Sequence, residues 1–297
     1  MAMTMTEFLT LADADLDSVW HEDEERYPEQ YSRLLNVVNQ SELYTREGKM
    51  AGFGPMREIP EDSDVTYENA IPPVTKRYDL VKRGGGYKIT EKLWKFDRYG
   101  EVKKFERDLR VADADDTETF FMSLFNNATT TTFTGFDGLA LASTAHTRLD
   151  GGATQANRPT VLTALSLTSL QDAVIAMRNI VDDRGRPVKN EPKKLLIPLD
   201  LIMVAEEILG SALRPDTANN TTNAIRRFGI EIVESPYIVS ATFAALLGSK
   251  HDLKAIWNQR PKQMSEVVFD SDTIKRKTTK WMGRGFGNWY GYHQINT

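Results

Sequence analysis

The chain has 297 residues, 40% of them hydrophobic, which is enough to fill the core of one large domain or two closely packed ones. Its 37 basic and 42 acidic side chains give a net charge of -5, so the positive charge that drives binding to phosphate backbones is absent, which argues against a free nucleic-acid-binding protein. The chain contains no cysteine, which excludes disulfides and thiolate metal sites.

The N-terminal segment, residues 1–51, is acidic and biased towards helix. Leu34, Leu35, Val37 and Val38 form a small apolar cluster that is too small to fold alone. The segment lacks the basic start and long apolar core of a signal peptide, and no stretch of about 18 apolar residues occurs in the chain. We therefore expect an N-terminal arm on a cytoplasmic protein that does not contact a membrane.

Residues 52–95 predict a long β-hairpin. Strand-like runs at Val74–Val81 and Tyr87–Leu93 are separated by the glycines Gly84–Gly86. The acidic side chains come first and the basic ones follow: Glu58, Glu61, Asp62, Asp64 and Glu68, then Lys76, Arg77, Lys82 and Arg83. Because this segment has too few apolar residues for its own core, we expect it to lie on a neighbouring subunit, with the acidic strip of one copy meeting the basic strip of the next.

A long helix is predicted from Glu101 to Asn127, where apolar residues recur mostly at three- and four-residue spacing. At 1.5 Å per residue this helix is about 40 Å long. Consecutive aspartates are poor helix formers, so Asp113, Asp115 and Asp116 mark the place where a kink or break is expected.

The second half of the chain alternates between helix and strand. The expected elements are, in chain order, a helix capped by Ser166 or Thr168 and ending near Asp182, a strand at 194–198, a helix at 201–211, strands at 229–234, 243–248 and 253–257, and long strands within 265–295. Strands interleaved with helices in this way indicate an α/β or α+β layer arrangement.

Motifs that could carry catalysis are incomplete. Ser143 and His146 form the one local serine–histidine pair that could suggest a hydrolase, but no Gly-x-Ser-x-Gly elbow surrounds the serine. The glycines Gly84–Gly86 could suggest a phosphate-binding loop, but no Lys-Ser/Thr pair follows them. We therefore predict a protein that is not an enzyme and has no catalytic residues.

Metal and cofactor sites are not predicted either. Asp13, Asp15, Asp17 and Glu24 match positions 1, 3, 5 and 12 of a calcium-binding loop, but Ser18 stands where the sharp turn of that loop requires glycine. Such a match arises readily by chance in an acidic segment, so a solvated arm is the simpler interpretation.

The densest basic cluster is formed by Lys275, Arg276, Lys277 and Lys280. A run of this kind is usually the solvated face of a strand, and contact with DNA or with an acidic patch on a neighbouring subunit is the alternative.

Several segments resemble the major head subunits of Mu-like phages and their relatives, which are tailed-phage capsid proteins of the Hong Kong ninety-seven fold class. These segments are FDGLALASTAH (136–146), AMRNIVDDRGRPV (176–188), PKKLLIP (192–198) with Asp200 and Leu201, RPDTANNTTN (214–223) and IVESPY (232–237). They span residues 136–237, and the order of the elements extends the likeness over nearly the whole chain.

The resemblance implies an α+β capsid fold with named parts. These are an N-terminal arm (1–51), an extended β-hairpin loop (52–95), a peripheral domain (96–159 and 263–297) that holds a spine helix at about 101–127 and the long C-terminal strands, and an axial domain (160–262). Loops of the axial domain would meet at the symmetry axis of each capsomer. The candidate residues for that axis are Arg214, Asp216, Asn219, Asn220, Arg226 and Arg227.

The implied function is that of a structural shell protein without cofactors. Pentamers and hexamers of the chain would form an icosahedral head around phage double-stranded DNA, contacting it non-specifically, with Lys275 to Lys280 as the candidate DNA-facing residues. The expected partners are further copies of the chain, a scaffolding protein and a portal protein, and a decoration protein is left open. The expected location is the virion, after assembly in the host cytoplasm. An encapsulin-type nanocompartment shell is the alternative.

Overall fold

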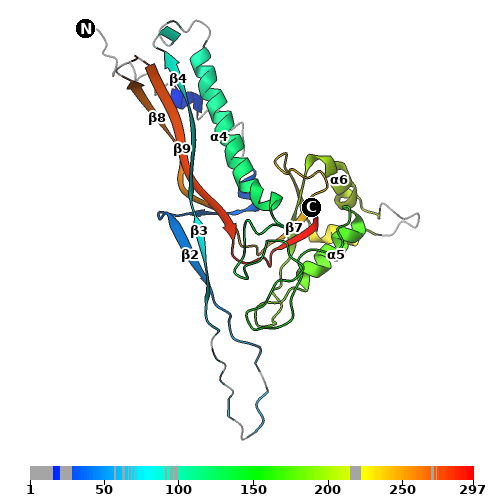
Figure 1. The fold of residues 1–297 in the computed structure, drawn as a ribbon. Coiled ribbons are helices and arrows are strands. Elements are labelled where there is room, and N and C mark those ends of the chain that lie inside the picture. The colour runs from blue at the N-terminus through cyan, green and yellow to red at the C-terminus, as the bar shows by residue number, and fades with distance from the viewer. Residues whose placement is uncertain are drawn as a thin grey trace.

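In a computed structural model of the chain, two bodies share one core, and a long loop extends away from them (Figure 1). The structure describes residues 16–20, 29–56, 58–61, 64–65, 67, 69, 71–90, 92–93, 96, 100–214, 222–268, 271 and 273–297. No helix in these ranges is long and apolar enough to cross a membrane.

The elongated body is built on a four-stranded sheet with the order β1-β8-β9-β4. Its strands are β1 (Asn36–Asn39), β8 (Leu253–Val268), β9 (Thr273–Phe286) and β4 (Val81–Thr90). β1 runs parallel to β8, whereas β9 is antiparallel to both β8 and β4. The sheet therefore joins the predicted arm, the predicted extended loop and the C-terminal strands.

Helix α4 (Glu101–Asn126) lies along this sheet (Figure 1). The predicted helix is confirmed to within one residue at its C-terminal end. It is not broken at the aspartates, because Asp113 and Asp116 form ion pairs with Lys280 of β9 and the hydroxyl of Tyr237 donates to Asp115. Tertiary partners thus compensate for the low helix propensity of aspartate.

The compact body contains a second four-stranded sheet with the order β10-β7-β5-β6. Its strands are β10 (Tyr292–Asn296), β7 (Ala244–Gly248), β5 (Pro192–Ile197) and β6 (Glu231–Glu234). The strands predicted at 194–198, 229–234 and 243–248 are found here with small shifts of their ends. β10 was predicted with the long strands of the peripheral domain, but it pairs with β7, and β8 runs past the predicted boundary at residue 262.

Helices α5 (Leu167–Arg178) and α6 (Ile202–Gly210) pack on one face of this sheet. Of the two predicted caps, Ser166 and Thr168, the structure forms the one at Ser166: its hydroxyl accepts the backbone N–H of Ser169 at 3.1 Å, and the Ser169 hydroxyl accepts the N–H of Ser166 at 2.8 Å. Two short 3-10 segments complete this body, Leu199–Leu201 before α6 and η2 (Ala224–Phe228) before β6.

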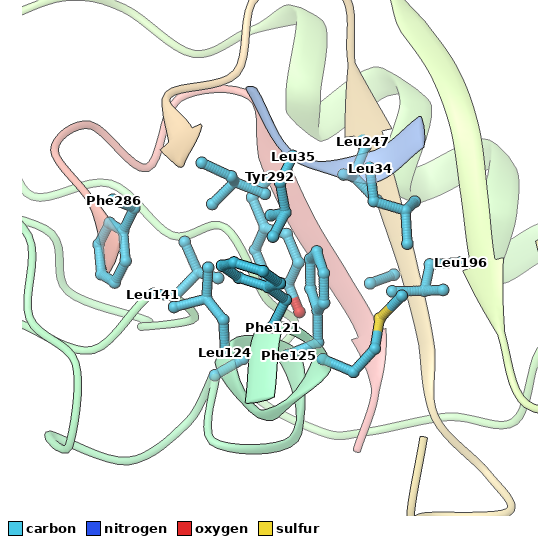
Figure 2. Packing of buried hydrophobic residues seen from close by; sticks show 14 of the residues in the cluster. Leu34, Leu35, Phe121, Leu124, Phe125, Leu141, Leu196, Leu247, Phe286 and Tyr292 are labelled. Atoms are coloured by element: carbon cyan, nitrogen blue, oxygen red, sulfur yellow. The ribbon is translucent and has the colours of Figure 1, made fainter. Parts of the chain in front are cut away.

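The main core contains residues from both bodies. Along β5, Leu195 and Ile197 face α5 and α6, whereas Leu196 between them faces the main core, as the two-residue period of a strand requires. Figure 2 shows the labelled side chains of this core gathered around the end of α4: Leu34, Leu35, Phe121, Leu124, Phe125, Leu141, Leu196, Leu247, Phe286 and Tyr292. The two bodies therefore cannot separate without exposing it.

The N-terminal arm contributes to this core through the short helix α2 (Tyr31–Leu34). The ring of Tyr31 stacks on Phe121 at 4.4 Å, and Leu34 and Leu35 are buried. Half of the apolar cluster predicted in the arm is thus part of the fold, whereas Val37 and Val38 on β1 remain exposed.

The strands at the base of the extended loop pair differently from the predicted hairpin. β2 (Tyr44–Lys49), inside the predicted arm, is the antiparallel partner of β3 (Val74–Asp79). The predicted pairing of Val74–Val81 with Tyr87–Leu93 is wrong, because β4 pairs with β9 instead. Gly84–Gly86, which suggest a turn in the sequence, lie within β4 and do not reverse the chain.

Two of these glycines are needed because β4 and β9 approach each other closely. A Cβ atom at Gly84 or Gly86 would lie 2.5 Å from a backbone carbonyl oxygen of β9, that of Thr278 or Arg276. A Cβ at Gly85 would meet only a side-chain carbon of Leu109, at an ordinary 3.6 Å.

We therefore expect Gly86→Ala to destabilise the protein by about 1 to 3 kcal/mol, the usual cost of overpacking, because the backbone of β4 must move away from β9. Gly85→Ala makes the same chemical change and should be tolerated. Denaturant unfolding of the two variants and the parent measures the difference. Equal stabilities for both variants would contradict the proposed close approach.

Candidate interaction surfaces

His146 has a structural environment. Its buried ring lies between Asp137, whose Oδ2 is 2.6 Å from Nδ1, and Asn157, whose Oδ1 is 3.1 Å from Nε2, and it stacks on Trp289 at 4.1 Å. Burial is the largest single influence and opposes ionisation of Asp137, but the interactions with His146 and the backbone N–H donors together outweigh it and hold the pKa of the aspartate below its usual range. The hydrogen bonds of His146 thus tie a loop to the core.

The alternative hydrolase pairing is not formed. The hydroxyl of Ser143 accepts the backbone N–H of Ala145 at 3.2 Å, and the backbone N–H of Ser143 donates to Asn157. The ring nitrogens of His146 are engaged by Asp137 and Asn157 instead. The geometry therefore does not present Ser143 and His146 as a nucleophile and its base.

The calcium-loop template falls mostly outside the described residues. Asp13, Asp15 and Glu24 of the calcium template lie outside the described residues, and Asp17 forms an ion pair with Arg276 at 2.6 Å. In the part of the chain that the structure describes, no group of three or more histidine, aspartate or glutamate residues is arranged to hold a metal ion.

The structure divides the basic cluster of β9 between the two faces of the sheet. Lys275 and Lys277 are exposed, whereas Arg276 and Lys280 are only 3% and 1% exposed and face α4. The prediction that Arg276 and Lys280 face DNA is therefore wrong. Strand alternation is the physical reason, because successive side chains point to opposite faces.

Arg276 and Lys280 form a buried ionic seam with α4, the helix that lies on them. The Nε of Arg276 lies 2.8 Å from Oε2 of Glu106, which also accepts the hydroxyl of Tyr87 at 2.6 Å. The Nζ of Lys280 lies 3.0 Å from Asp113 and 3.1 Å from Asp116. Burial raises the pKa of Asp113, and the adjacent Lys280 opposes that rise.

The spacing of these residues explains why the helix follows the strand. Glu106 and Asp113 are two helical turns apart, about 10 Å along α4. Arg276 and Lys280 are four residues apart on one face of β9, about 13 Å along the strand. The two pairs therefore meet when helix and strand run side by side, and they fix the position of α4 along the sheet.

Glu118 holds the arm against α4. Its buried carboxylate accepts the backbone N–H of Gln30 at 2.6 Å and that of Tyr31 at 3.1 Å. Burial is the main reason that its pKa is raised to about 7; the two N–H groups lower it and Glu29 raises it further. The start of α2 is thus anchored by an acid that titrates near neutral pH.

The extended loop, which in the structure is the segment between β2 and β3 (residues 50–73), carries exposed apolar side chains. These are Met50, Phe53, Met56, Ile59, Val65 and Tyr67, with Phe53 70% and Tyr67 90% exposed. The low apolar content of the whole segment gives no sign of these side chains. The regular three-residue spacing of Met50, Phe53, Met56 and Ile59 is the signal that could have shown them.

The charged residues predicted for subunit contacts lie in two places. The acidic Glu58, Glu61 and Asp64 are exposed in the extended loop, and Asp62 and Glu68 lie outside the described residues. The basic residues lie at its base and on β4, where each has an intramolecular partner.

Lys76 lies over the ring of Phe286, and burial lowers its pKa to about 8. Arg77 pairs with Asp79 at 2.6 Å. On β4, Lys82 lies 5.6 Å from the ring centre of Trp281, and Arg83 Nε donates to Asp116 at 3.0 Å. These basic residues therefore form a strip, but each already has a partner within its own chain. A neighbouring subunit that binds the strip must share it with those partners.

The predicted axial residues are described only in part. Asp216, Asn219 and Asn220 lie outside the described residues, whereas Arg226 and Arg227 are exposed on η2. A bridge between Leu213 and Thr222 closes the neck of the loop next to Arg214.

A comparison with protein families matches residues 73–293, more than half of the chain, to the family described as phage capsid protein. The chain belongs to the phage capsid protein family. As a member it is a structural protein of the phage virion. None of the curated proteins matches the sequence.

Solved capsids have the same fold despite low sequence identity. The capsid of the empty GTA particle matches with a TM-score of 0.60 and 8% identity, covering 91% of this chain and 90% of that chain. Mycobacterium phage Adephagia matches at 0.58 and 9%, covering 90% and 89%. The capsid of cyanophage P-SCSP1u matches at 0.57 and 11%, covering 89% and 87%.

The ionic seam predicts that replacing two nearby lysines of β9 in this capsid protein, Lys280 and Lys277, destabilises the fold to different extents. Lys280→Met leaves Asp113 buried beside Asp116 without the ammonium group, and should destabilise the fold by about 3 to 5 kcal/mol. Lys277→Met, on the exposed face of β9, should change stability by less than about 0.5 kcal/mol. Chemical denaturation of both variants tests this; a tolerated Lys280→Met would show that the seam does not hold α4.

Glu118 predicts a pH-dependent stability. Because its folded pKa of about 7 exceeds the ordinary 4.5, the folded chain keeps a proton that the unfolded chain loses between these values, and the free energy of unfolding falls as the pH rises from 4.5 to 7. Glu118→Gln should remove about 1 to 3 kcal/mol of this fall. Urea unfolding across this pH range measures it, with the exposed Glu207→Gln as control; equal slopes for parent and Glu118→Gln would contradict it.

Proposed function

We propose that this chain is the major capsid protein of a tailed phage, a shell subunit of the Hong Kong ninety-seven fold class related to Mu-like head proteins. Copies of the chain assemble as pentamers and hexamers into an icosahedral head that encloses double-stranded DNA. The observation that carries this proposal is the extended loop, whose apolar side chains are exposed in the single chain. Soluble monomers rarely expose such a group of apolar side chains, and it marks a surface that another protein covers.

The architecture supports a division of labour between parts of the subunit. The elongated body with α4 acts as the peripheral domain, and the compact body acts as the axial domain, with η2 and the neck of the 214–222 loop near the capsomer axis. The arm is bound to the core of its own subunit through α2. Any contact between the arm and another subunit is additional to this one.

The extended loop lies over the adjacent subunit in this proposal. Its apolar side chains supply most of the binding free energy, because apolar burial is the dominant favourable term in association. Glu58, Glu61 and Asp64, with Asp62 and Glu68, select the orientation by meeting the basic strip around Arg77 and Lys82 of the next copy.

The remaining partners follow from the same role. Lys275 and Lys277, exposed on β9, are the residues left to face packaged DNA after Arg276 and Lys280 are assigned to the ionic seam. A scaffolding protein and a portal protein take part in assembly, which occurs in the host cytoplasm.

Replacing Phe53 and Met56 together by serine tests the role of the loop. Both side chains are largely or fully exposed, so the variant should fold with unchanged thermal stability. Shell formation should fall by at least about tenfold, as expected for the loss of interface anchors. Electron microscopy and sedimentation of the parent and variant, each produced with the scaffold, measure the closed shells.

Val239→Ser is the matched control, because Val239 is an exposed apolar residue outside the loop. It should assemble as the parent does. Closed shells at parental yield from the loop variant would contradict the proposed docking of the loop.

A further inference from the structure

One turn of the compact body, residues 182–186, holds the base of the extended loop through hydrogen bonds. The guanidinium group of Arg184 donates from Nε to the carbonyl oxygen of Gly52 at 2.8 Å and from Nη2 to that of Asn69 at 3.1 Å. Gly52 follows β2 and Asn69 precedes β3, so one side chain bridges the outgoing and returning sides of the loop.

The turn that presents Arg184 is itself well ordered by hydrogen bonds. Asp182 accepts the backbone N–H groups of Arg184 and Arg186, each at 2.9 Å, and pairs with the Arg186 guanidinium at 2.8 Å. Burial opposes ionisation of Asp182, but these donors outweigh it and hold the pKa of the aspartate below its usual range. Gly185 closes the turn with a φ of +78°, a conformation that favours glycine.

A second contact supports the same junction. The Nζ of Lys49, the last residue of β2, lies 2.6 Å from Asp183 and 2.9 Å from the hydroxyl of Tyr290. The ion pair is largely buried, so it is screened less by salt than a surface pair would be. The loop therefore leaves the compact body through a fixed point.

We propose that Arg184 is a positioning residue that sets the direction of the extended loop relative to the compact body. β2 and β3 are paired only up to Lys49 and Val74, so beyond that point the strand ladder no longer fixes the loop. The planar guanidinium fork has donors in fixed directions and can hold two carbonyl oxygens at once. A small change of angle at this base moves the far end of the loop by a large distance.

The proposed role of Arg184 in assembly rests on the proposed function. If the loop binds the next subunit, then its direction decides which surface the apolar side chains reach. Arg184 also links the extended loop to the compact body, so a rotation of the compact body carries the loop with it.

The absence of cysteine allows a direct test. Met56→Cys in the loop and Lys193→Cys at an exposed site on β5 accept a pair of nitroxide labels. Double electron–electron resonance on unassembled subunits then gives the distribution of distances between loop and compact body. In Arg184→Gln this distribution should be about twice as broad, because a segment without its tether samples a wider range.

Arg227→Gln is the control, because it removes the charge of an exposed arginine on η2 of the same body. Thermal unfolding of all variants verifies that they are folded. A purely stabilising role of Arg184 would change the unfolding temperature without broadening the distances. A distance distribution in Arg184→Gln as narrow as that in the parent would overturn the inference.

Shell assembly of Arg184→Gln, without labels, provides the second measurement. About tenfold fewer closed shells than the parent would support the link between loop direction and assembly. A broadened loop with parental shell yield would overturn that link. Failure of the parent itself to form shells counts against the proposed function, and the distance measurement on free subunits still decides the positioning role.

Discussion

The structure depends first on the pairing of buried charges between α4 and β9. A helix of 26 residues that carries buried acids can lie on a sheet only if those acids are neutralised there. Arg276 and Lys280 do this from one face of β9, and the matching distances along helix and strand set the position of the helix. Breaking one pair leaves a buried charge without a counter-charge. The ion pairs therefore favour one position of α4 along β9 over others.

The shared core makes the two bodies one unit. Phe121 and Phe125 at the end of α4 pack with residues of the arm and of both sheets. Glu118 adds a polar contact by accepting two backbone N–H groups of the arm, at the cost of burying a carboxylate. The arm thus docks through apolar burial together with an acid whose protonation state changes near neutral pH.

In the proposed function, this capsid protein acts through its surfaces more than through a pocket. The histidine that could have suggested catalysis, His146, is enclosed by Asp137, Asn157 and Trp289 as part of the core. The extended loop carries several exposed apolar side chains, and the turn that contains Arg184 holds the base of that loop. In the proposed shell, a held base and an exposed apolar far end would let each subunit bind its neighbour in a defined direction.

The sequence by itself determined the local elements: the long helix after Gly100, a helix capped by Ser166 or Thr168, and the strands near 194–198, 229–234 and 243–248 all follow from periodicity and capping chemistry. It did not determine which strands pair, because Gly84–Gly86 suit both a turn and a close strand contact. Nor could it separate Arg276 and Lys280 from their exposed neighbours, because the direction of a side chain depends on which face of β9 the helix covers. These features depend on contacts between residues far apart in the chain, and only the tertiary structure decides them.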